Sequence, residues 1–101
     1  MDKIKEQEQE YILNYRYQYP CYQFARDNKG ADIESLQEVI VNSERNDLLF
    51  LFANYVKDSD VKALYNRFMK NKGYKYGLTD KFKQLMKKYE QRINRKRKTT
   101  T

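Results

Sequence analysis

Several residue types that carry common protein chemistry are rare or missing in this chain. It has no histidine, no tryptophan, one cysteine, one proline and three glycines in 101 residues. Cys21 cannot form an intrachain disulfide, which favours a reducing, cytoplasmic compartment. Without histidine and with one thiol, a zinc site of nitrogen and sulfur ligands is not expected. We predict no metal and no cofactor.

Long hydrophobic runs and catalytic motifs are also missing. The longest apolar run, residues 48–53, is far shorter than the ~20 residues that cross a bilayer, and nothing resembles a signal peptide. There is no histidine base, no recognisable acid pair and no activating partner for a nucleophile. Cys21 is therefore expected to be a small buried residue. We predict one non-enzymatic domain.

Charge is unevenly distributed along the chain. Residues 1–73 contain 11 Lys and Arg against 12 Asp and Glu, a net charge of −1. Residues 74–101 contain 10 against 2, a net charge of +8, and the two parts give the overall +7. A nearly neutral body therefore carries a strongly basic C-terminal quarter.

Apolar residues recur at helical spacing, and strand-like alternation is absent. This pattern predicts an all-α fold, a small helical bundle or short α-solenoid of about five or six helices. We expect helices over residues 2–17, 20–27, 33–42 and 47–57, a fifth after Asp60, and a last one from Thr79 to Ile93. Residues 1–93 form one domain in this interpretation. Residues 94–101 lack apolar side chains and are expected to form a disordered basic tail.

The chain matches itself at an offset of 28 residues. The identical pairs are Phe24/Phe52, Ala25/Ala53, Lys29/Lys57, Asp32/Asp60 and Leu36/Leu64. Phe-Ala suits a close helix contact, and Asp before an apolar run suits a helix N-cap. The offset predicts two helix-turn-helix units, residues 20–45 and 48–72, stacked as in an α-solenoid with the first and last helices as end caps.

The first unit carries a recognisable pattern. "FARDNKGADIESLQEVIVNS" resembles a short helical repeat, FAxxxKGADIxxLQxxVIxS, found in tandem in uncharacterised proteins of bacteria and their phages. The copies cover residues 22–43 and 50–71, and the second departs from the pattern at Asp58, Ser59 and Tyr65. The resemblance implies a helical repeat fold and a bacterial or mobile-element origin, and it supplies no catalytic residues.

The turn of that unit, Asn28 to Asp32, has the composition of a ligand loop. In a guanine-binding loop the aspartate stands three residues after the asparagine, and here Ala31 occupies that position. No glycine-rich phosphate loop is present either. We interpret "NKGAD" as a turn between helices.

Tyrosines crowd the N-terminal part of the chain. Tyr11, Tyr15, Tyr19 and Tyr22 share one helical stripe, which we interpret as facing the core, with a base-stacking or protein-binding surface as the alternative. Tyr17 lies off this stripe and is predicted to contact a partner. Tyr74 and Tyr76 stand in a glycine-bounded loop, where they either contact a partner or serve the fold.

The basic C-terminal quarter is the candidate nucleic-acid interface. Phosphate contacts by lysines are independent of base sequence and sensitive to salt. A solvated, solubilising helix face is the alternative, and a membrane-surface role is disfavoured because the core needs the apolar side of the helix. The predicted phosphate-binding residues are Lys75, Lys83, Lys87, Lys88, Arg92, Arg95, Lys96, Arg97 and Lys98.

These features predict a non-catalytic binding module. Its helical body would bind a protein or nucleoprotein complex, and its basic end would contact DNA or RNA phosphates. The repeat resemblance points to a phage or mobile-element accessory protein, with an anti-CRISPR-type inhibitor as one specific form. A stand-alone DNA- or RNA-binding regulator and a structural oligomeriser are the alternatives.

Overall fold

The computed structural model describes the backbone of residues 1–99 and the side chains of residues 1–95. Within these residues the chain is all-helical, as the sequence predicts, with six helices and no strand. The helices are α1 (Lys3–Tyr15), α2 (Gln18–Asp27), α3 (Ile33–Val41), α4 (Asn46–Tyr55), α5 (Val61–Lys70) and α6 (Thr79–Thr99). None of these described helices combines the length and apolar character that a bilayer span requires.

Aspartate side chains cap three of the helices. Asp2 Oδ1 accepts a hydrogen bond from the Lys5 amide at 2.9 Å, at the start of α1. Asp32 does the same for the Ser35 amide at 3.2 Å, and Asp60 for the Ala63 amide at 3.1 Å. The prediction that Asp32 and Asp60 are N-caps is therefore confirmed, and each cap pairs an amide that the helix itself leaves without a partner.

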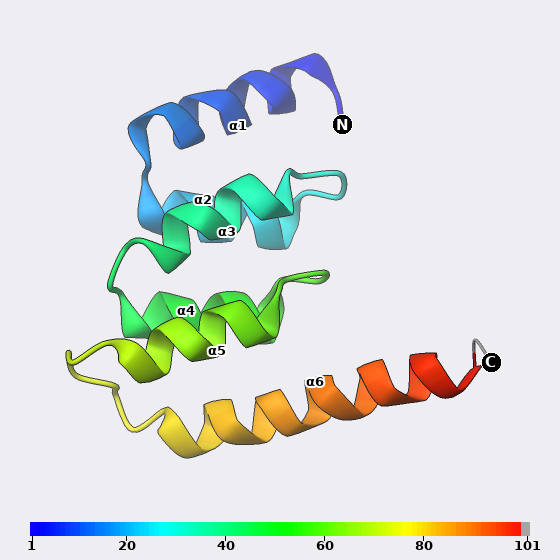
Figure 1. Ribbon diagram of the computed structural model, residues 1–101. Coiled ribbons are helices and arrows are strands. Elements are labelled where there is room, and N and C mark those ends of the chain that lie inside the picture. Colours follow the sequence, from blue (N-terminus) through cyan, green and yellow to red (C-terminus); the bar gives the residue numbers. More distant parts are fainter. Residues whose placement is uncertain (100–101) are drawn as a thin grey trace.

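The helices stack into a flat slab (Figure 1). The Cα atoms span 40 × 39 × 16 Å, and the short dimension corresponds to two helix layers at the usual spacing of about 8–10 Å. α1 packs on α2 and α3, the α2–α3 pair packs on the α4–α5 pair, and α6 packs on α5. Each element thus touches mainly its neighbours in the stack, as in an α-solenoid.

The 28-residue offset recurs in the backbone. Gly30 and Asp58 hold equivalent turn positions, and both have positive φ, 88° and 67°. Asp tolerates this left-handed conformation better than most residues, which explains why the second unit manages without glycine here. Arg16 and Glu44, again 28 apart, have φ of 51° and 60° at the α1–α2 and α3–α4 connections. The repeat therefore extends back into α1.

A pair of glutamines shows the same equivalence. Gln37 Oε1 accepts the Asp60 amide at 2.8 Å, and its Nε2 donates to the Asp60 carbonyl at 3.2 Å. One repeat earlier, Gln9 Oε1 accepts the Asp32 amide at 2.7 Å. α1 therefore occupies the position that α3 and α5 occupy in the two complete units.

The core is built from the matched positions of the two units. Phe24 and Phe52 are buried, as are Leu36 and Leu64. Ala25 and Ala53 are also buried and let the helices approach closely. The repeat positions assigned to packing from the sequence are confirmed in that role.

α6 is anchored by one aromatic residue, and it is longer than the helix predicted over Thr79 to Ile93. The fully buried ring of Phe82 lies 4.9 Å from Phe68, 5.4 Å from Phe50 and 5.4 Å from Tyr65, measured between ring centroids. The helix continues beyond Ile93 to Thr99, since Lys, Arg and Asn can extend a helix without packing against the core.

The predicted core-facing tyrosine stripe is wrong except at Tyr22. Tyr22 is 3% exposed, whereas Tyr11 and Tyr15 are 56% and 63% exposed, and Tyr19 is exposed too. α1 is the end of the stack and is covered on one side only. Ile12 fills that side, with Leu13 and Gln9 half-buried beside it, and the tyrosines point outward.

Candidate functional site

The basic helix α6 presents its cations to solvent in two rows. Its inner side holds Phe82 and Met86, with Leu85, Tyr89 and Ile93 half-buried. At about 100° per residue, Lys88, Arg92 and Arg95 fall on one flank of this apolar stripe, and Lys83 and Lys87 fall on the other. All five of these predicted residues are exposed.

Few acidic groups neutralise these rows. α6 contains only Asp80 and Glu90 as acids. In the part of the chain with described side chains, the three ion pairs join Lys5 to Glu8, Arg26 to Asp27 and Arg45 to Asp47, all outside α6. Lys83, Lys87, Lys88 and Arg92 thus keep their charge available for an anionic ligand.

Lys75 differs from the other predicted cations. Its ammonium group donates to the Asn71 carbonyl at 2.8 Å and lies 5.7 Å from the centre of the Phe68 ring. These contacts give the carbonyl of Asn71, the C-cap residue of α5, a partner and hold Lys75 half-buried. The structure places it in the fold of the α5–α6 loop, apart from the α6 rows. The side chains of Lys96, Arg97 and Lys98 lie outside the described residues.

The predicted partner residue Tyr17 belongs to an exposed aromatic cluster. The Tyr15 and Tyr17 rings stack with centroids 5.7 Å apart, and Tyr11 lies 4.8 Å from Tyr15 and 6.1 Å from Tyr17. A side-chain hydrogen bond with Tyr11 raises the pKa of Tyr17 above the usual tyrosine range. The three rings support one another on the surface, which reduces the freedom they would lose on binding a partner.

Tyr74 and Tyr76 form a second exposed pair. They are 76% and 55% exposed, and their centroids are 4.9 Å apart in an edge-to-face arrangement. The buried Asn46 holds the loop in place, since its amide donates to the Tyr74 carbonyl at 3.1 Å and its oxygen accepts from Asn71 at 2.9 Å. Both rings therefore project from a fixed backbone.

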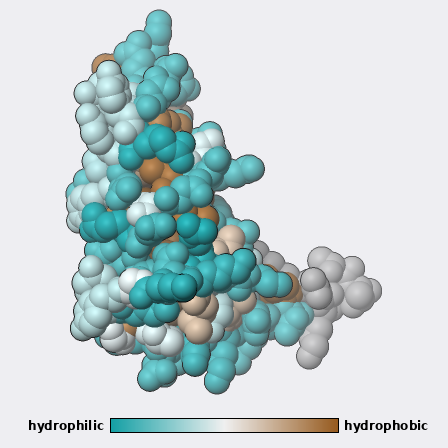
Figure 2. All heavy atoms as spheres, turned by 60° about the vertical axis from the view of Figure 1, so that its left-hand side comes forward, coloured by the Kyte–Doolittle hydropathy of each residue, from teal (hydrophilic) through white to brown (hydrophobic). Residues whose placement is uncertain are grey.

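The predicted partner residues share one side of the slab. The α1–α2, α3–α4 and α5–α6 connections all lie on the left in Figure 1, so Tyr17 and the Tyr74–Tyr76 pair belong to the same edge. Figure 2 turns this side forward and shows a predominantly hydrophilic surface, with hydrophobic residues visible mainly between helices. We refer to Tyr17, Tyr74 and Tyr76 as the tyrosine edge.

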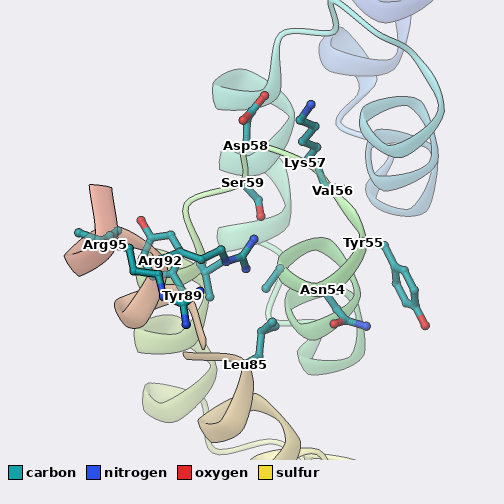
Figure 3. Close-up of a pocket in the computed structure, with 13 residues that line it drawn as sticks. Asn54, Tyr55, Val56, Lys57, Asp58, Ser59, Leu85, Tyr89, Arg92 and Arg95 are labelled. Atoms are coloured by element: carbon teal, nitrogen blue, oxygen red, sulfur yellow. The ribbon is translucent and has the colours of Figure 1, made fainter. Parts of the chain in front are cut away.

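A groove of about 700 Å³ separates the α4–α5 turn from the middle of α6, residues 85–95. Its apolar residues include Val56, Val61 and Leu85, and Tyr89 and Arg92 line the α6 side. Figure 3 shows Arg92 extending toward the turn, whereas Lys57 and Asp58 point away from α6. This groove is not predicted by the sequence. The 28-residue match locates the turn, but no sequence signal brings it next to α6.

Cys21 lies on the buried side of α2, where burial raises the pKa of its thiol to about 11. The thiol is therefore protonated at neutral pH and shielded from solvent, which makes it a poor nucleophile. Within the described residues, no group of three or more Cys, Asp or Glu side chains is placed to hold a metal ion.

Comparison of the chain with protein-family models, with curated proteins and with solved structures finds no match. The repeat resemblance noted in the sequence is therefore left as a prediction.

Proposed function

We propose that this protein is a non-catalytic binding module that holds nucleic-acid phosphates along α6. The observation that carries the proposal is the set of exposed cations on the solvent side of α6, of which Lys83, Lys87, Lys88 and Arg92 have no ion-pair partner among the described residues. Lysines on flexible stems contact phosphates without reading bases, so the binding is independent of sequence.

The distribution of charge favours a linear polyanion as the ligand. α6 is 21 residues long, about 30 Å at 1.5 Å per residue, and its cations follow both flanks of the apolar stripe. Neighbouring phosphates of a nucleic acid strand are spaced closely enough for several to meet one row. The same helix keeps its apolar side against α5, which leaves no large apolar face for membrane insertion.

A titration with a labelled oligonucleotide tests this proposal. The logarithm of the association constant is expected to fall linearly with the logarithm of salt concentration. Replacing Lys83, Lys87 and Lys88 by Gln should lower affinity and flatten the salt dependence. The matched control replaces the exposed Lys3, Lys29 and Lys62 by Gln, which removes the same charge elsewhere. Equal losses in both variants, or binding that ignores salt, would overturn the proposal.

The tyrosine edge supports the second half of the function, docking onto a protein within a nucleoprotein complex. Exposed tyrosines held in fixed positions are characteristic of binding hot spots. The three-residue variant Tyr17→Ser, Tyr74→Ser, Tyr76→Ser should lose a nuclease-resistant protein partner and keep oligonucleotide binding. Retention of the partner by this variant would assign docking to another surface.

The proposed biological setting is based on the repeat resemblance. That resemblance supports a phage or mobile-element accessory protein, of which an anti-CRISPR-type inhibitor is one specific form. A stand-alone DNA- or RNA-binding regulator would use the α6 surface and would not need the tyrosine edge. A structural oligomeriser would show an assembly state that rises with concentration in sedimentation, independently of α6 charge.

A further inference from the structure

The groove between the α4–α5 turn and α6 combines an apolar lining with neighbouring positive charge, which suits a ligand that is both apolar and anionic. Val56 and Val61 are buried at its base, and Leu85, Tyr89 and Ile93 contribute half-buried apolar surface from α6. Its volume of about 700 Å³ falls within the usual range of about 300–1,000 Å³ for small-molecule sites. It is an apolar slot beside a basic helix.

Arg92 supplies the polar recognition at this slot. Its guanidinium extends from α6 toward the turn (Figure 3), and Arg95 also lines the groove. Among the described residues that line it, Asp58 is the only acid, and its side chain points away from α6 in the same view. A planar guanidinium suits a phosphate, which it can bind through two parallel hydrogen bonds.

Tyr89 supplies a surface on which a flat group can stack. It lines the groove and is half-exposed, and no other aromatic ring contacts it in the part of the structure with described side chains. Aromatic residues beside a basic track are the usual means by which proteins bind unpaired bases. A duplex keeps its bases stacked inside and cannot present one to such a slot.

Continuity with the α6 row selects the occupant. Lys88 lies on the same flank of α6 as Arg92 and Arg95, so a strand whose phosphates follow this row passes the mouth of the groove. We propose that the groove accepts one unpaired base of a single-stranded nucleic acid, stacked on Tyr89, with its phosphate bound by Arg92. This inference rests on the proposed function and adds a preference for single strands.

The test compares a labelled oligothymidine strand with a labelled duplex of the same length at one salt concentration. Tyr89→Leu keeps an apolar side chain and removes the stacking ring. It is expected to weaken single-strand binding roughly fivefold to a hundredfold and to leave duplex binding unchanged. Tyr19→Leu is the matched control, because Tyr19 is exposed on α2 and is not among the residues that line the groove.

A second comparison does not depend on the packing of Tyr89. Arg92→Gln and Lys83→Gln each remove one exposed positive charge from α6, on opposite flanks. Both should weaken duplex binding to the same extent, and Arg92→Gln should weaken single-strand binding more. Equal effects of the two variants on the single strand would overturn the groove inference.

The remaining outcomes separate the two proposals. Wild-type protein that binds neither oligonucleotide contradicts the proposed function itself. Strong binding to both, unaffected by Tyr89→Leu, leaves the α6 proposal standing and removes the groove. If Tyr89→Leu instead weakens binding of a glutamate–tyrosine copolymer and spares the single strand, the groove is a peptide site and the inference is wrong.

Discussion

At the scale of single residues, the glutamine that links one unit to the next has the most consequential position. Gln37 is buried and uses both ends of its amide on the backbone of Asp60, whose own side chain caps α5. One side chain thereby fixes the turn, the start of α5 and the spacing between α3 and α5. Gln9 makes the corresponding contact to Asp32 from the partly exposed end of the stack.

Gln37→Ala should therefore lower the free energy of unfolding by about 1–3 kcal/mol, since it leaves the partly buried Asp60 amide without a partner, while the Asp60 carbonyl keeps the Leu64 amide. Urea denaturation followed by circular dichroism measures the change. Gln23→Ala is the control, because Gln23 is exposed on α2. Equal stability of the two variants would show that the Gln37 contacts do not hold the units together.

At the scale of elements, α6 depends on a narrow attachment. It packs on α5, with Phe82 inserted among Phe50, Tyr65 and Phe68, while the stretch after Ile93 extends past the body (Figure 1). α2 to α5 pack on neighbours on more than one side. The packing of α6, which carries the candidate phosphate site, can therefore be weakened without the same effect on α2 to α5.

Phe82→Ala removes a fully buried ring, a change that typically costs about 3–5 kcal/mol. We expect hydrogen exchange of α6 amides to accelerate strongly, with a smaller change in α2 and α3. Gln84→Ala, at an exposed position on the same helix, should leave exchange unchanged. A uniform acceleration across all helices would mean that the stack unfolds as one unit.

Across the whole molecule, the positive net charge is concentrated at one end of the stack. The nearly neutral helices α1–α5 form the body, and α6 forms a basic end layer of the slab. The tyrosine edge runs along the side that carries the α1–α2, α3–α4 and α5–α6 connections (Figure 1). A nucleic acid on α6 and a protein on the edge therefore occupy different surfaces of the same body.

Lysine acetylation in the presence of an oligonucleotide tests this separation. Lys83, Lys87 and Lys88 should be protected from acetylation, because bound phosphates shield their ammonium groups. Lys3, Lys29 and Lys62, exposed on other elements, should react as in the free protein. Mass spectrometry of the labelled peptides measures the extent of acetylation of both sets of lysines in one experiment. Protection spread over all six lysines would indicate binding to the body.

The sequence contained a further signal that the 28-residue comparison did not use. "QEYILN" at Gln9 to Asn14 matches "QEVIVN" at Gln37 to Asn42 in four of six positions. Had the comparison started at α1, it would have placed Ile12 in the core, as Ile40 is. Tyr11 matches the buried Val39, so its exposure follows from the position of α1 and not from the repeat. The wrong tyrosine stripe came from treating α1 as a helix covered by others, when it is the end of the stack.

Four features were predictable from the amino-acid sequence alone: the all-helical class, the Asp32 and Asp60 caps, the matched core positions and the basic character of α6. These depend on local hydrogen bonding, on helical spacing and on net charge, which are properties of short stretches of chain. Three other features became visible only in the folded molecule. Lys75 turns inward over Phe68, Tyr17 shares an edge with Tyr74 and Tyr76, and Arg92 faces the α4–α5 turn. Those relations join residues distant in sequence, and they follow from how the helices stack.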